Sequence, residues 1–96
     1  MRLLMKIPLP SPAENPLRRD ANFDALWKDF LLGLGAGEVH SAAPGQQRID
    51  YAVFEIADLA AIFALAKAVH EWIGVKPEFL PEVTPKPYFG APGSGR

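Results

Sequence analysis

The side chains from residue 48 to residue 56 alternate between two faces, which is the pattern of a half-buried β-strand. One face is apolar after Asp50 and should lie against the core, because it carries Ala52, Phe54 and Ile56. The opposite face carries Ile49, Tyr51, Val53 and Glu55. This second face is apolar enough to be buried, yet it also holds a phenol and a carboxylate that an ordinary core would not explain.

Directly after this strand the hydrophobic spacing becomes helical. Asp58 supplies an N-cap acceptor, and Gly74 is suited to the left-handed position that ends a helix. Between them one apolar stripe is formed by Ile62, Leu65, Ala66, Val69 and Ile73. The pattern therefore predicts an amphipathic helix that packs against the apolar face of the strand.

A second strand and helix are predicted in the first third of the chain. Residues 1–9 alternate, so Lys6 points away from the face formed by Leu3, Met5, Ile7 and Leu9. Asn15-Pro16 can open a short helical turn, with Asn15 as cap and Pro16 at the first position. A longer helix begins near Asn22, with a wide apolar stripe at Phe23, Leu26, Trp27, Phe30, Leu31 and Leu34.

Two more strands complete the set. Residues 38–42 form a short strand, and Pro44-Gly45 fits a type II turn that leads back into residues 48–56 as an antiparallel hairpin. The last strand spans residues 75–83, where Pro77 and Pro81 favour an edge position.

The element order is thus β-α-β-β-α-β, which predicts an α+β, ferredoxin-like domain with a four-stranded antiparallel sheet and two helices on one face. We expect a single domain over residues 1–89 and a flexible tail over residues 90–96. The other face of the sheet would have no cover from this chain. A partly apolar, uncovered sheet face on a small domain indicates a partner, and a second copy would close a dimeric α/β barrel.

Composition narrows the functional classes. The net charge of −1 argues against a nucleic-acid partner, and no segment is long and apolar enough to predict a membrane span. With no cysteine, no phosphate-binding loop and no His-Glu-x-x-His motif, neither a cofactor nor a metal is expected. His70 is better explained by its favourable place near a helix C-terminus. A cytoplasmic location is the default expectation.

The candidate pocket lies on the uncovered face of the sheet. Tyr51 and Glu55 should converge there with Lys6 or Arg2. This group could bind a small aromatic or carbonyl compound. The simpler alternative is a salt bridge that sets the register of a dimer. His40 can act as a general base on that face or can lie at its rim, hydrated, depending on strand register.

Three segments resemble a family of small, uncharacterised bacterial proteins of the dimeric α/β-barrel superfamily. These are MRLLMKIPLP at the start, IDYAVFEIAD in the central strand and PEFLPEVTP near the end, so the resemblance covers about residues 1–86. It implies a homodimer with a ferredoxin-like fold and implies no agreed activity. In the last strand the family often has a histidine where this sequence has Leu80. Leu80 is included in the candidate pocket by this position, but the sequence departs from the family there and lacks the histidine on which a site would be built.

Three functions follow as hypotheses. The first is a homodimer that binds a small, largely apolar ligand on the uncovered sheet face. The second is a cofactor-independent monooxygenase or isomerase that uses the same pocket, and the third is a purely structural dimerisation module.

Overall fold

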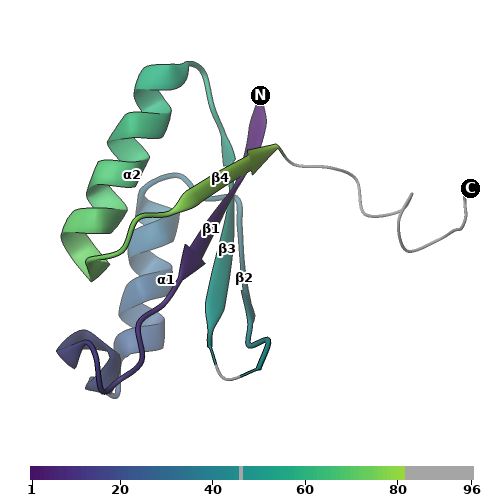
Figure 1. Cartoon of the computed structure of the whole chain (residues 1–96). Coiled ribbons are helices and arrows are strands. Elements are labelled where there is room, and N and C mark those ends of the chain that lie inside the picture. The colour runs from purple at the N-terminus through teal and green to yellow at the C-terminus, as the bar shows by residue number, and fades with distance from the viewer. Residues whose placement is uncertain (46, 82–96) are drawn as a thin grey trace, which may run out of the picture.

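The computed structural model describes residues 1–45 and 47–81, which form a sheet layer and a helix layer (Figure 1). The four strands are β1 (Arg2–Pro8), β2 (Glu38–Ala42), β3 (Ile49–Glu55) and β4 (Glu78–Pro81). The helices are a 3-10 helix, η1 (Pro16–Arg19), and two α-helices, α1 (Phe23–Gly33) and α2 (Leu59–Ile73). The α+β class and the β-α-β-β-α-β order predicted from the sequence are confirmed.

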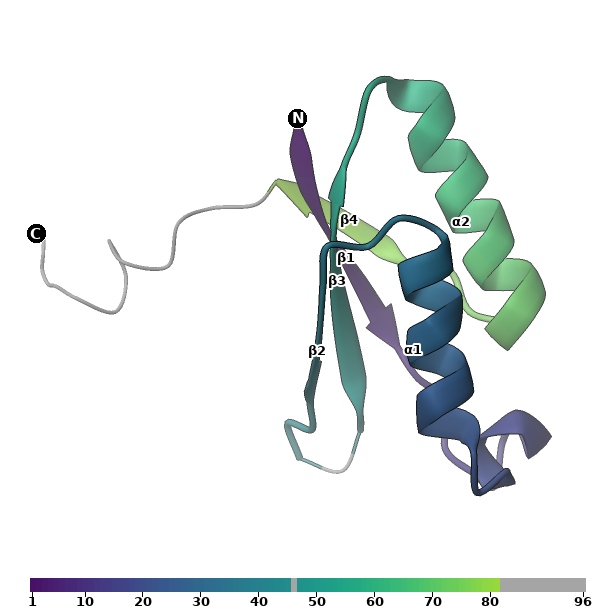
Figure 2. The same cartoon turned by 180° about the vertical axis from the view of Figure 1, so that it is seen from behind.

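The sheet is antiparallel throughout, in the order β2-β3-β1-β4. β1 and β3 occupy the centre, as expected for the two strands with the most apolar core-facing side chains. β4 lies at an edge, where Pro77 just before it and Pro81 at its end are tolerated. Both α-helices lie on the same side of the sheet in the two opposite views (Figures 1 and 2). The sheet therefore has one covered face and one that no described helix covers.

The core lies between the sheet and the helices. Its central residues are buried side chains from both central strands and both helices, among them Met5, Ile7, Trp27, Leu31, Ala52, Val69 and Ile73. Four aromatic rings contact one another between the two helices, those of Phe23, Trp27 and Phe30 on α1 and of Trp72 on α2. The centroid separations are 5.3 Å for Trp27 and Trp72 and 5.1 Å for Phe30 and Trp72. These aromatic contacts explain why both tryptophans belong to the packing of the helices rather than to an exposed platform.

The predicted helix ends are confirmed in detail. The Asp58 carboxylate accepts the Ala61 N–H at 3.0 Å, and Gly74 ends α2 with a φ of +84°. Asn15 caps η1 by accepting the Leu17 N–H at 2.9 Å, and it also donates to the Ile73 carbonyl at 3.0 Å. The latter bond ties the loop after β1 to the end of α2.

The structure differs from the sequence prediction in two places. β4 is shorter than the predicted span 75–83, because Pro77 cannot donate to a neighbouring strand, and residues 82–83 lie outside the described part. The apolar stripe of α1 is narrower than predicted, since Leu26 is 50% exposed. The predicted tail at residues 90–96 also lies outside the described residues. Among those described, none of the helices is long and apolar enough to span a membrane.

Candidate functional site

The five residues predicted for the pocket all lie on the sheet face opposite the helices, which we call the open face. Strand register places His40, Tyr51 and Lys6 in one row across β2, β3 and β1. Leu80 lies in the next row, where it faces Leu4 across β1 and β4, and Glu55 lies opposite Arg2 one row further on. The register of His40, left open by the sequence, thus puts it beside Tyr51. The open face comprises Arg2, Leu4, Lys6, Pro8, Glu38, His40, Ala42, Ile49, Tyr51, Val53, Glu55, Glu78 and Leu80.

The charged side chains of the open face pair with one another. Glu55 forms an ion pair with Arg2 at 3.8 Å. Lys6 pairs with Glu78 at 3.9 Å rather than with Glu55. His40 lies 3.0 Å from the Glu38 carboxylate. Most of these groups are exposed, so each pair contributes little to stability by itself, typically below about 1 kcal/mol. Their arrangement instead sets the charge pattern that a partner of this face would meet.

Apolar side chains fill the space between these charges. Leu4, Val53 and Leu80 form a continuous row from β3 through β1 to β4, and Tyr51 lies beside this row. Val53 is only 7% exposed although no described helix lies above it, and it is not part of the core cluster on the helix side. The neighbouring side chains of the open face therefore already shield its methyl groups.

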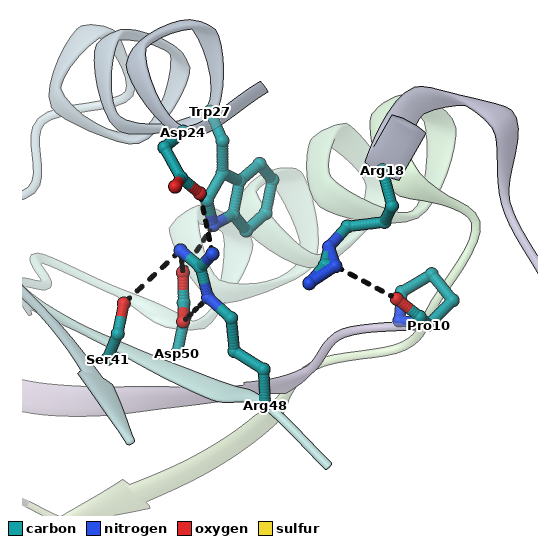
Figure 3. A network of polar contacts seen from close by, with 7 residues as sticks. All are labelled: Pro10, Arg18, Asp24, Trp27, Ser41, Arg48 and Asp50. Carbon is teal, nitrogen blue, oxygen red and sulfur yellow. Dashed lines mark hydrogen bonds and ion pairs between the residues drawn. The ribbon is translucent and has the colours of Figure 1, made fainter. Parts of the chain in front are cut away.

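A second polar site, on the helix side of the sheet, centres on Arg48 (Figure 3). The Asp50 carboxylate is fully buried and accepts hydrogen bonds from Arg48 Nε at 2.9 Å, Arg48 Nη2 at 3.1 Å and Trp27 Nε1 at 2.8 Å. Arg48 also donates to Asp24 on α1 and to Ser41 on β2, the latter at 3.3 Å. One arginine thus joins the start of α1 to two strands.

The electrostatics of this network keep Arg48 charged. Its pKa is raised, first because Asp50 accepts its hydrogen bonds, and further by the bond to Asp24, while partial burial acts in the opposite direction. The buried carboxylate is matched by three donors, which is what a buried charge requires. The network is therefore complete, and it stabilises the junction of α1 with the hairpin.

Arg48 lines three clefts. One, of about 280 Å³, lies between Arg48 and the loop that follows β1. A second, of about 290 Å³, lies toward α1 and is lined by Asp24, Trp27, Lys28, Val39, Ser41, Arg48 and Asp50. The third, of about 320 Å³, is formed with Asp24 and residues 41–43. None of the three is lined by Lys6, His40, Tyr51, Glu55 or Leu80. The concave surface at Arg48 and the predicted pocket are hence different places on the molecule.

The pattern of residues along the chain does not by itself reveal this second site. Asp50 was assigned correctly to the core-facing side of its strand, and a carboxylate on that side is itself a signal that a buried cation must be close. Arg48, on the same strand face, was the nearest candidate. Asp24 and Trp27 could be added only once the position of α1 relative to β3 was known.

The last polar features to place are His70 and the possible metal ligands of the described residues. His70 is exposed in the last turn of α2, as its predicted dipole role requires. Within residues 1–45 and 47–81 no group of three or more histidine, aspartate or glutamate side chains is placed to hold a metal ion.

Comparison with known proteins adds no relative from which a function could be transferred. No family model, curated protein or solved structure matches the chain, so its resemblance to dimeric α/β-barrel proteins stays a prediction.

Proposed function

We propose that this protein is a homodimer that closes an α/β barrel through its open face and holds a small, largely apolar ligand there. The observation that carries the proposal is the apolar row of Leu4, Val53 and Leu80, with Tyr51 beside it, on a sheet face that no described helix covers. Packing the half-buried Leu4, Tyr51 and Leu80 against a partner removes apolar surface from water, at roughly 25 cal/mol for each Å² buried, whereas Val53 is already shielded and adds little.

A second copy is the partner that best suits the charges around this row. The open face carries the cations Arg2 and Lys6 and the anions Glu38, Glu55 and Glu78, so both signs lie on one surface. In a two-fold interface the same patch faces itself in the opposite orientation, which lets cations of one copy approach anions of the other. A face of one sign would repel its own copy.

The dimer is tested by measuring molar mass with light scattering at micromolar concentration. The wild type should be a dimer, and Leu80→Lys should dissociate it because the new ammonium would be buried in the apolar row. Leu26→Lys, on the exposed side of α1, is the matched control and should remain dimeric. A monomeric wild type, or dissociation by both variants alike, would remove the proposal.

The ligand is tested separately on the dimer. Native mass spectrometry of the gently purified protein should show a bound small molecule, and the Leu80→Lys variant should lose it. A crystal structure in which side chains fill the space between the two sheets would exclude the ligand and leave a structural dimerisation module.

One observation favours catalysis as a second candidate, namely a cofactor-independent oxygenase or isomerase. Tyr51 lies directly opposite Lys6 on one side and His40 on the other. With Glu78, which lies opposite Lys6 on β4, four titratable groups share one row. If the face is an active site, Tyr51→Phe should abolish turnover of a substrate while its binding persists, because only a proton donor is removed. Unchanged turnover in this variant would exclude the catalytic role of the phenol.

A further inference from the structure

The cleft between η1 and the start of β3 lies on the helix side of the sheet, away from the open face. It is lined by Leu9, Pro10, Ser11, Pro12, Glu14, Arg18, Gln47 and Arg48, and its volume is about 280 Å³. The volumes of small-molecule sites generally start at about 300 Å³, so a cleft of this size is at the lower limit and can hold only a small ligand. Two arginines and an apolar wall of leucine and prolines give it both a charged and an apolar side.

The two arginines of this cleft differ in how their donors are used. Arg48 is held by two carboxylates, those of Asp50 and Asp24. Arg18 forms no ion pair with any described residue, and its only hydrogen bond among these residues is a long one, 3.5 Å, from Nη1 to the Pro10 carbonyl. Its Nε is buried and has no acceptor among the described residues. Arg18 therefore carries hydrogen-bonding capacity that the described residues leave unused. Because Nε is itself enclosed, a ligand in the cleft would meet the Nη groups first.

Arg18 is nevertheless held in place. Its guanidinium lies 5.1 Å from the centroid of the Phe23 ring, and η1, which carries it, is capped by Asn15. Figure 3 shows Arg18 and Arg48 extending their guanidinium groups toward the same region from different elements. A positioned guanidinium loses less side-chain freedom on binding a ligand than a mobile one does.

We propose that this cleft binds a small monocarboxylate with an apolar body, whose carboxylate pairs with Arg18 and whose apolar part lies against Leu9, Pro10 and Pro12. A planar carboxylate matches the two parallel donors of a guanidinium. A single negative charge matches the one uncommitted cation. Glu14 also lines this cleft, with its Oε1 accepting the Ser11 N–H at 2.8 Å, and its negative charge opposes a doubly charged phosphate more strongly than a singly charged carboxylate.

The test uses benzoate, titrated into the full-length protein and followed by NMR of backbone amides and of arginine Nε–H groups. Saturable shifts should be confined to the loop at residues 9–18 and to Arg48. Arg18→Gln should weaken binding about tenfold or more, the loss expected for a charge-assisted hydrogen bond. Arg19→Gln is the matched control: Arg19 is the next residue of η1 and donates instead to the Pro12 carbonyl, so it should change affinity less than about twofold.

Further arms separate the possible ligand chemistries. Benzamide, which is neutral, should bind at least about tenfold more weakly than benzoate. Arg18→Lys keeps the charge without the planar fork, so it should bind benzoate more weakly than the wild type, and it provides a folded variant if Arg18→Gln does not fold. The proposal is overturned if benzoate produces no saturable shift, if Arg18→Lys binds as well as wild type, or if inorganic phosphate binds more tightly than benzoate. Because the open face is not involved, these results do not depend on the dimer.

Discussion

Replacing Asp50 by asparagine changes one oxygen of a fully buried carboxylate into an NH₂ group while almost preserving its shape. Asp50 accepts three hydrogen bonds, two from Arg48 and one from Trp27. An asparagine can accept only through its single oxygen. Whichever way the amide is turned, its NH₂ group faces at least one N–H donor, and Arg48 loses its buried counter-charge.

The magnitude follows from the burial of the pair. Removing one partner of a buried ion pair costs about 3–5 kcal/mol. The lower end applies here, because the Arg48 side chain is 25% exposed and retains Asp24. We therefore expect Asp50→Asn to lower the free energy of unfolding by about 3 kcal/mol. In a domain of this size that corresponds to a fall in Tm of about 12 °C or more.

Asp24→Asn is the matched control, since it removes the other carboxylate from the same arginine. The Asp24 side chain is 75% exposed, so this loss should be only about 0.5 kcal/mol. Both values come from urea unfolding followed by circular dichroism at one fixed protein concentration, with unchanged m-values. An Asp50→Asn loss below about 1 kcal/mol, or no larger than that of Asp24→Asn, would show that the buried network does not stabilise the protein as described.

Three further stability predictions can be measured by the same urea unfolding. Leu31→Ala should cost about 2–5 kcal/mol because Leu31 is fully buried, whereas its neighbour Leu32, 44% exposed, should lose less than about 1 kcal/mol when replaced by alanine; similar losses would contradict the packing of α1. Gly74→Ala should cost about 1–2 kcal/mol through its positive φ alone, since no atom of the described residues lies within 4 Å of the new Cβ. Gly33→Ala, at a helical position with equal space, should be neutral or stabilising. Asp58→Ala should cost about 1 kcal/mol by removing the cap of α2, and an unchanged stability would show that the 3.0 Å bond to Ala61 has no net value.

The order of elements could be predicted because each is encoded by nearby residues. β3 and α2 were found from a change of period between residues 56 and 59, and their caps from Asp58 and Gly74, whose side chains act within one helical turn. The ends of β4 were less certain, since Pro77 and Pro81 leave few donors to define a strand. Edge strands depend on their neighbour more than on their own sequence.

The candidate site was predicted only in part. Alternation along β1, β2 and β3 was sufficient to assign Lys6, His40, Tyr51 and Glu55 to one face. It could not choose between Lys6 and Arg2 as the partner of Glu55. The register gives Glu55 to Arg2 and places Lys6 beside Glu78. A shift of strand pairing changes which side chains meet without changing which face they share.

The residues themselves determined the two faces of the central strand, because the side-chain period of a β-strand is a local property of the backbone. Only the tertiary structure decided what each face meets. The covered face brings Asp50 to Trp27, 23 residues away, and uses Arg48 to join Asp24 and Ser41. Such contacts depend on where the helix lies against the sheet, and that placement is set by packing across the whole core rather than by any one segment.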